Sequence, residues 1–249
     1  LQSVEQELLS YVEEHYDKVI VVLNTAMVME TGFLDDEAID AALWIGMPGS
    51  RGCGSLGNIL AGEVNPSGHL ADTYAYDLTT APSYYNFGDY TYSNFDGNNK
   101  YVYYQEGIYV GYRYYETAAA DGYIDYDTTV QFPFGYGLSY TNFDWEVEKT
   151  ELGDIGGTIN IDVKVTNTGD VAGKDVVELY YAAPYDPAEE IEKSSVVLGA
   201  FEKTNTLKPG ESETVTLTMN VDDMASYDYK NNKCYVLSAG DYEFRLQPV

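Results

Sequence analysis

The segment from Phe132 to Phe143, FPFGYGLSYTNF, separates two parts of the chain that have different hydrophobic patterns. Gly135 and Gly137 allow backbone angles that other residues avoid, and the aromatic side chains around them offer a large area for packing. Before this segment, apolar runs alternate with amphipathic ones, whereas short alternating stretches follow it. We therefore expect two structural units, residues 1–117 and 143–249, joined by an aromatic, glycine-containing linker over residues 118–142.

The first unit shows the order strand, helix, strand, helix, strand. The helix expected at Ser3–Tyr16 begins with a capping-box pattern at Ser3 and Gln6, and the apolar run Val19–Leu23 predicts a strand that is buried on both faces. Further elements are expected as a helix at Leu34–Ala42, a strand at Leu43–Ile45, a helix at Ser55–Ala61 and a strand at Leu70–Tyr76. This order predicts a partial, open and mostly parallel α/β sandwich with right-handed crossovers.

The second unit reads as a set of short strands. Thr158–Thr166 alternates strictly between apolar and polar residues, as expected of a half-buried strand. Similar strands separated by turn signals are expected at Asp175–Tyr181, Ser195–Glu202, Ser212–Val221, Lys233–Leu237 and Asp241–Leu246. Strands at such short intervals predict an immunoglobulin-type β-sandwich, so the fold class is α/β followed by all-β.

Charge and cysteine content exclude several classes of protein. The net charge of −28 repels phosphate groups, so we expect neither nucleic acid nor an anionic membrane as a partner. No apolar run approaches membrane-spanning length, and the first residues do not resemble a signal peptide, which predicts a cytoplasmic or truncated chain. Cys53 and Cys234 fall in different units, so we expect two buried free thiols and no disulfide.

The segment Gly52–Gly57 matches the dinucleotide-binding pattern G-x-G-x-x-G, and Asp72 follows at a distance that suits a ribose-binding acid. Two observations disfavour this interpretation. The expected strand at Leu43–Ile45 ends well before Gly52, with Pro48 between them, so the glycines do not form a tight strand-to-helix turn. Asp72 also opens its expected strand, whereas a ribose-binding acid closes one. A dinucleotide-binding enzyme is kept as an alternative, and no cofactor is expected.

Metal and triad sites find little support in the sequence. His15 and His69 are isolated, and the cysteines lack ligand spacing, so no metal site is expected. Asp96 and Asn98 are better explained by a solvated turn than by a Ca²⁺ site. Ser67 lies near His69 in sequence, but its place in a proline-containing turn explains it more simply than a catalytic triad does.

The chain has 26 tyrosines, many of them between Tyr84 and Tyr126. A phenol has both a flat face and a hydroxyl group, so Tyr90, Tyr92 and Tyr103 are candidates for a sugar-stacking rim; the alternative is an aromatic surface that packs against another domain. Glu106 lies among these aromatics, where desolvation raises the pKa of a carboxyl group and suits it to acid catalysis. Its structural alternative is an ion pair with Arg113 or bonds to backbone amides.

Five stretches in order carry a resemblance to one family. They are the linker Phe132–Phe143 and the stretches Trp44–Leu70, Glu106–Tyr115, Val165–Tyr181 and Leu198–Glu213. Together they resemble glycoside hydrolase family 3, the β-glucosidase family, in its α/β-sandwich and fibronectin-III-like domains. The tyrosine-rich insertion is most similar to bacterial members from anaerobic gut or rumen species, some of which carry their domains in permuted order.

The resemblance implies a retaining β-glucosidase in which the two catalytic carboxylates lie close together across the sugar. In the family, the nucleophile belongs to a TIM barrel and the acid/base glutamate to a segment upstream of the Ser3–Tyr16 helix. Neither is similar to any part of this chain, so no catalytic residue is assigned, and Glu106 is not given the acid/base role. The resemblance therefore implies β-glucosides as substrates of the complete enzyme, a missing barrel as partner, and an inactive chain in isolation.

Two alternatives and one physical consequence follow. A stand-alone carbohydrate-binding or adhesion module would explain the tyrosines without catalysis, and the dinucleotide-binding enzyme is the less favoured alternative. An incomplete sheet leaves an exposed edge and an uncovered apolar face. We therefore expect the chain to associate with a copy of itself or with a partner fragment, or to be cut from a longer protein.

Overall fold

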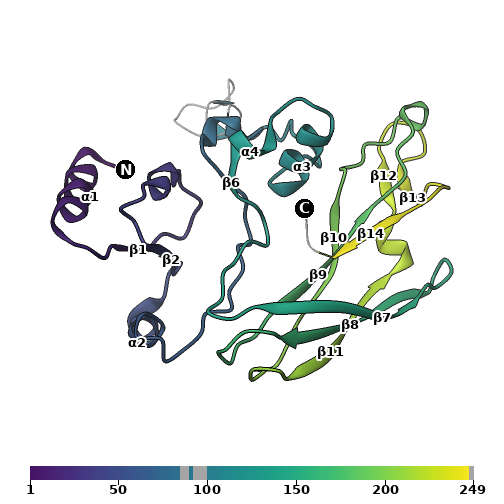
Figure 1. The fold of residues 1–249 in the computed structure, drawn as a ribbon. Helices are drawn as coiled ribbons and strands as arrows, with labels where there is room; N and C mark the ends of the chain where they lie inside the picture. The colour runs from purple at the N-terminus through teal and green to yellow at the C-terminus, as the bar shows by residue number, and fades with distance from the viewer. Residues whose placement is uncertain (85–89, 92–99, 247–249) are drawn as a thin grey trace.

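The computed structural model describes residues 1–84, 90–91 and 100–246 of the chain. Figure 1 shows an N-terminal group of helices and short strands at one side and a β-sandwich at the other. Two extended segments run side by side between them, one leading from α2 toward β3 and the other from β6 toward β7. The linker therefore lies against an earlier part of the chain.

The N-terminal group consists of α1 (Ser3–His15), β1 (Ile20–Leu23), β2 (Ala41–Trp44) and α2 (Gly49–Leu60). β1 and β2 pair in parallel, with Ile20 opposite Ala41 and Leu23 opposite Trp44. The capping box of α1 uses Gln2 and Glu5, one residue before the predicted pair. The helix predicted at Leu34–Ala42 is wrong: a short 3-10 helix, η1 (Gly32–Asp35), is followed by an irregular segment and then β2.

A middle layer connects this group to the sandwich. β3 (Tyr74–Ala75) is shorter than the predicted strand and pairs antiparallel with β6 (Val130–Phe132), which lies within the stretch predicted as the linker. Two short helices, α3 (Tyr112–Ala120) and α4 (Tyr126–Thr129), lie between β5 (Lys100–Tyr101) and β6. Ala75, Tyr115 and Val130 form a small buried cluster here. The remaining elements of this layer are η2 (Leu78–Thr80) and β4 (Tyr90–Thr91).

The sandwich packs two three-stranded antiparallel sheets face to face. One sheet has the order β11–β8–β7, and the other β10–β9–β14. Their strands are β7 (Phe143–Glu151), β8 (Thr158–Asn167), β9 (Val176–Ala182), β10 (Val197–Lys203), β11 (Ser212–Asn220) and β14 (Glu243–Leu246), and a separate hairpin is formed by β12 (Ser226–Asp228) and β13 (Cys234–Val236). The predicted strands of this unit are confirmed within a few residues. β7 is an additional strand, and 3-10 turns at Pro187–Glu189 and Val221–Met224 complete the unit.

Burial is distributed very unevenly between the two units. The main core belongs to the sandwich, where Val163, Val165, Val177, Leu179 and Leu217 are fully inaccessible. In contrast, α1 and α2 contain no buried residue. β1 was predicted to be buried on both faces, but the side chain of Ile20 is 49% exposed, because the described residues supply no layer over it. A large core therefore stabilises the sandwich, whereas the N-terminal group has little of its own.

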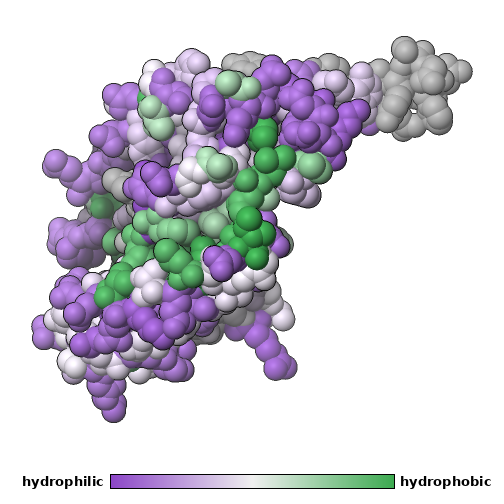
Figure 2. Space-filling view, turned by 90° about the vertical axis from the view of Figure 1, so that its right-hand side faces the viewer, coloured by the Kyte–Doolittle hydropathy of each residue, from purple (hydrophilic) through white to green (hydrophobic). Residues whose placement is uncertain are grey.

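Two surface observations complete the description. Cys53 and Cys234 are free, as predicted, but both are exposed, so the prediction of buried thiols is wrong. Figure 2 shows one side of the molecule, where a hydrophobic band crosses an otherwise largely hydrophilic surface. Within the described residues, no helix combines the length and apolar character needed to cross a membrane.

Candidate functional site

The predicted sugar-rim residues lie in the segment that leads into α3. Tyr90 belongs to β4 and pairs with Tyr101 of β5, whereas Tyr92 lies outside the described residues. Tyr103 follows β5, and its side chain is 59% exposed. Glu106 comes three residues later and is half-buried. The structure thus places Tyr103 and Glu106 on one short segment, with Tyr103 accessible from solvent.

The carboxylate of Glu106 has an unusual environment. Its Oε2 atom is buried and has no hydrogen-bond partner among the described residues. The predicted ion pair with Arg113 is absent from the salt bridges of the described chain; instead, Nε of Arg113 donates a 3.5 Å hydrogen bond to the hydroxyl of Tyr112. A buried carboxylate oxygen without a donor is unfavourable. A donor from a ligand or from another part of a longer protein would satisfy this oxygen.

A loop of the sandwich lies against the same segment. The hydroxyl of Tyr109 donates to the carbonyl of Lys193 over 3.4 Å, and Glu192 lies close to Gly107. Burial and the nearby charge of Glu192 raise the pKa of the Tyr109 hydroxyl, which therefore stays protonated at neutral pH. Sequence analysis missed the contacts of Glu192 with Gly107 and of Lys193 with Tyr109, because the sandwich brings these residues together across more than 80 residues of sequence and no local motif marks them.

Hydrogen bonds hold this sandwich loop in place. Nζ of Lys193 is nearly inaccessible and donates to the Pro184 carbonyl (2.6 Å), Oε2 of Glu189 (3.0 Å) and Oγ of Ser238 (2.6 Å). All three ammonium protons of Lys193 thus have acceptors, so the buried charge is fully paired. The hydrogen bonds from Ser238 and Lys193 lower the pKa of Glu189 and keep its carboxylate ionised. Lys193 is therefore a structural residue, and the loop beside Glu106 is anchored.

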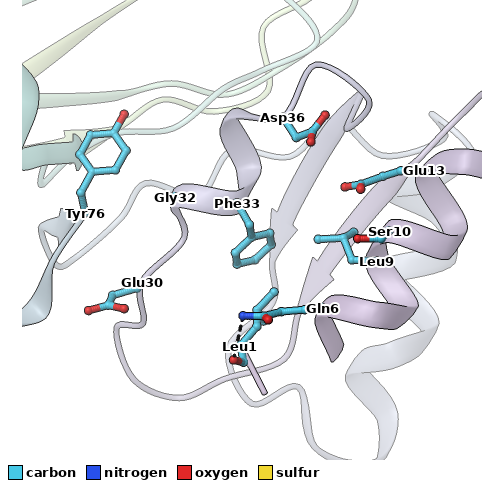
Figure 3. A pocket seen from close by; sticks show the side chains of 10 residues that line it. All are labelled: Leu1, Gln6, Leu9, Ser10, Glu13, Glu30, Gly32, Phe33, Asp36 and Tyr76. Atoms are coloured by element: carbon cyan, nitrogen blue, oxygen red, sulfur yellow. Dashed lines mark hydrogen bonds between the residues drawn. The ribbon is translucent and has the colours of Figure 1, made fainter. Parts of the chain in front are cut away.

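A separate cavity of about 580 Å³ lies between α1 and η1 (Figure 3). Leu1, Leu9 and Phe33 provide apolar walls, while the carboxylate of Glu13 comes from α1 and those of Glu30 and Asp36 come from the segments before and after η1. Oε1 of Glu30 already accepts a hydrogen bond from the amide of Leu78. Of the predicted rim residues whose side chains the structure describes, neither Tyr103 nor Glu106 lines this cavity, so these two residues and the cavity do not form one site.

The dinucleotide interpretation conflicts with the geometry. Gly52, Gly54 and Gly57 lie inside α2, which runs from Gly49 to Leu60, and do not form a phosphate-binding loop before a helix. Asp72 lies in a bend before β3, where burial raises the pKa of its carboxyl group. The alternative of a dinucleotide-binding enzyme is therefore wrong on structural grounds. In the described parts of the chain, no three histidine, cysteine or acidic side chains gather as metal ligands.

Comparison with known protein families defines the class of the chain. Residues 1–112 match the glycosyl hydrolase family 3 C-terminal domain. Residues 175–248 match the fibronectin type III-like domain. The architecture described above, an α/β unit followed by an immunoglobulin-type sandwich, is the one that these two matches predict.

Known β-glucosidases match almost the whole chain. β-Glucosidase A of Butyrivibrio fibrisolvens is 38% identical over 99% of this chain and 30% of its own length. The crystal structure of a β-glucosidase from Paenibacillus barengoltzii superimposes with a TM-score of 0.85 at 40% identity, over 99% of this chain and 26% of that one. A β-glucosidase 3B structure from Thermotoga neapolitana, in complex with glucose, gives a TM-score of 0.82 at 34% identity, covering 99% of this chain and 32% of that one.

The matches confirm the family recognised from the sequence motifs. This chain belongs to glycoside hydrolase family 3 and carries its C-terminal α/β domain together with its fibronectin type III-like domain. It spans less than a third of the length of the relatives named above, which therefore contain at least one further domain.

Proposed function

We propose that this chain is the non-barrel portion of a retaining β-glucosidase, an enzyme that hydrolyses terminal β-D-glucosyl residues. The observation that carries the proposal is the match of β-glucosidases to 98–99% of the chain at 38% identity, while the chain spans only 24–30% of their length. In this proposal, the α/β unit and the sandwich support a barrel domain that lies elsewhere in a longer protein and carries the nucleophile.

The chain is proposed to be inactive by itself. Retaining hydrolysis requires two carboxyl groups about 5–5.5 Å apart, one as nucleophile and one as acid/base. The nucleophile and acid/base segments implied by the family resemblance are absent from these 249 residues. The unevenly distributed burial supports the same proposal, because the exposed faces of α1, β1 and α2 suit a unit that other parts of a larger protein cover.

Tyr103 and Glu106 are proposed as part of the substrate rim, together with Tyr90 and Tyr92. The exposed ring of Tyr103 offers a stacking face, and the unpaired Oε2 of Glu106 is an acceptor for a sugar hydroxyl. β-Glucosides or oligosaccharides would reach this rim in the complete enzyme. The role is one of contact at the aglycone side and leaves bond cleavage to carboxylates outside the chain.

The decisive experiment measures hydrolysis of p-nitrophenyl β-D-glucoside by the purified 249-residue chain and by the longer protein that contains it. We expect turnover only from the longer protein. Turnover by the isolated chain that is abolished in Glu106→Gln would overturn the proposal. Binding of a soluble β-glucan by the isolated chain, combined with an inactive longer protein, would favour the carbohydrate-binding module instead.

Two further expectations belong to this proposal. The first is a cytoplasmic location, which stays a prediction that fractionation of cells producing the longer protein checks. The second is association of the isolated chain with a copy of itself or with the missing barrel portion. Exposed apolar side chains on α1, such as Val4 at 71% and Leu8 at 64% exposure, support this second expectation.

A further inference from the structure

The turn Asn65–His69 contacts parts of the chain that are far away in sequence. Oδ1 of Asn65 accepts hydrogen bonds from the amide of Tyr140 (2.9 Å) and the hydroxyl of Ser139 (3.1 Å). Its Nδ2 donates to the carbonyl of Ala172 over 3.2 Å. One side chain therefore connects this turn both to the linker and to the loop between β8 and β9 of the sandwich.

His69 extends the same contact region. Its Nδ1 lies 2.7 Å from the carbonyl oxygen of Gly135 and must carry the proton, because a carbonyl oxygen only accepts. Two backbone hydrogen bonds of 2.8 Å join Leu70 to Gly135 and Tyr136. They fix how the residues after the turn align with the linker. On its other side, Nε2 of His69 faces Oδ1 of Asp175 at 3.9 Å, with both side chains largely buried.

Two further strands of the sandwich contribute to this region, one by a bond to the turn itself and the other by a bond to Asp175. Nζ of Lys203, at the end of β10, donates to the carbonyl of Ser67 over 2.6 Å. Burial and the neighbouring charge of Lys174 lower the pKa of Lys203. The indole of Trp145 on β7 donates to Oδ2 of Asp175 over 2.7 Å and holds that carboxylate beside the histidine.

Two glycines show how closely the segments approach. A Cβ atom at Gly173 would lie 2.7 Å from Nδ2 of Asn65, and one at Gly137 would lie 3.1 Å from the ring of His69. Both distances are shorter than ordinary van der Waals contact. The turn is therefore packed so closely against the linker and the sandwich loop that a side chain at either glycine would clash with it.

α3 forms a second set of hydrogen bonds between the middle layer and the sandwich, away from the turn Asn65–His69. The amide of Leu198 on β10 donates to the hydroxyl of Tyr112 over 3.0 Å, and the amide of Ser195 donates to Oγ1 of Thr117 over 2.9 Å. The segment with Tyr103 and Glu106 leads directly into this helix. The middle layer is thus attached to the sandwich at both of its ends.

We propose that Asn65–His69 is an interlock that makes the middle layer and the sandwich one cooperative unit, whose boundary lies near residue 65 and not at the linker. Asn65 is the positioning residue of this interlock. The unit differs from the two family matches, which end at residue 112 and begin at residue 175 and so leave the linker, β7 and β8 outside both. It also holds the Tyr103–Glu106 segment in a fixed place relative to the sandwich.

Native-state hydrogen exchange on the full 249-residue chain tests the proposal. In the unsubstituted chain, we expect the amides of β6 and those of β8 to exchange with protection factors within about tenfold of each other, since both require the same unfolding event. In Asn65→Ala, we expect the protection of β6 to fall at least tenfold more than that of β8. A difference much larger than tenfold between β6 and β8 in the unsubstituted chain already overturns the proposal.

The matched control is Asn160→Ala. Asn160 is also partly buried, but its two side-chain hydrogen bonds, to Thr158 and from Thr218, stay within the sandwich. We expect this substitution to change β6 and β8 by the same factor. If Asn65→Ala behaves like the control, the interlock has no coupling role and the proposal fails.

A second variant, Asn65→Asp, keeps the two acceptor bonds from Ser139 and Tyr140, but it places a carboxylate oxygen, which cannot donate, against the carbonyl of Ala172. We expect a selective loss of protection in β6, as in Asn65→Ala, because the contact with the sandwich loop is broken while the contact with the linker is kept. An equal loss in both strands contradicts the proposal even if the alanine variant does not fold.

Discussion

The hydroxyl of Thr141 donates a 2.7 Å hydrogen bond to Oδ1 of Asn167, an amide side chain that is completely inaccessible to solvent. Thr141 belongs to the end of the linker, and Asn167 is the last residue of β8. Nδ2 of Asn167 donates in turn to the carbonyls of Val171 (2.8 Å) and Leu207 (2.9 Å). A single buried amide therefore holds the linker, a sandwich loop and the segment after β10 together.

Replacement of Asn167 by alanine is the first prediction. It removes the partner of several buried polar groups at once, and each such group left unsatisfied costs about 1–3 kcal/mol. We expect the free energy of unfolding to fall by about 3 kcal/mol or more, measured by urea denaturation with circular dichroism. The control is Thr166→Ala, which removes an exposed hydroxyl pair with Ser212 and should change stability by less than about 1 kcal/mol.

The second prediction concerns Gly135 in the linker. Its φ angle is +80°, and a Cβ atom there would lie 3.2 Å from Cδ of the buried Glu178, with a carboxylate oxygen closer still. Gly210 has nearly the same φ of +78° but open space around it. We expect Gly210→Ala to destabilise by about 1–2 kcal/mol through backbone strain alone.

In Gly135→Ala, the steric conflict with Glu178 adds to that strain, and overpacking of this kind costs typically about 1–3 kcal/mol. We therefore expect Gly135→Ala to be the more destabilising of the two variants by at least about 1 kcal/mol. Thermal and urea unfolding of both variants measure this difference. Equal losses in the two variants would show that Glu178 simply moves aside and that the linker tolerates a side chain.

The third prediction is a pH dependence that arises from Glu116. The hydroxyl of Tyr126 donates a 2.5 Å hydrogen bond to Oε1 of Glu116, and burial raises the pKa of this carboxyl group despite that bond and the nearby charge of Arg245. A raised pKa in the folded state means that, above the usual pKa of glutamate, the folded chain binds more protons than the unfolded one. The contribution of Glu116 to stability therefore decreases as pH rises through this window.

Glu116→Gln should remove that contribution, because the amide cannot titrate and its carbonyl oxygen still accepts from Tyr126. We expect the variant to gain stability relative to the unsubstituted chain as the pH is raised from about 4.5 to 7. Urea denaturation at a series of pH values measures the difference between the two chains. A constant difference across this range would contradict the assignment of a raised pKa to Glu116.

The sandwich could be predicted almost completely from the sequence, because its strands alternate between apolar and polar residues. This alternation shows both where a strand lies and which of its faces is buried. Thr158–Thr166, for example, was predicted one residue short of β8. The N-terminal group was harder. The segment Leu34–Ala42 has helical spacing, yet β2 begins at Ala41, since pairing with β1 overrides the local preference.

The candidate site was less predictable than the fold. Tyr103 and Glu106 could be chosen from the local density of aromatic residues, but Glu192 and Lys193, which contact Gly107 and Tyr109 of the same segment, carry no local signal. The same is true of Asn65, whose partners lie 74 to 107 residues away. Contacts of this kind depend on how two units dock, which a pattern of hydrophobic residues along one strand or helix does not encode.

The last prediction concerns association of the isolated chain through α1. This helix has no buried residue, and Val4 and Leu8 on it are 71% and 64% exposed, so apolar area is available for contact with a second chain. We expect light scattering coupled to size-exclusion chromatography to show a mass above 27.7 kDa that rises with concentration. The double substitution Val4→Lys and Leu8→Lys should shift the chain toward the monomer, because charged side chains oppose burial of this face.

Leu152→Lys, at a site that is 69% exposed on the sandwich, serves as the control and should leave the mass unchanged. A monomer at all concentrations in the unsubstituted chain would show that the exposed face of α1 does not drive association.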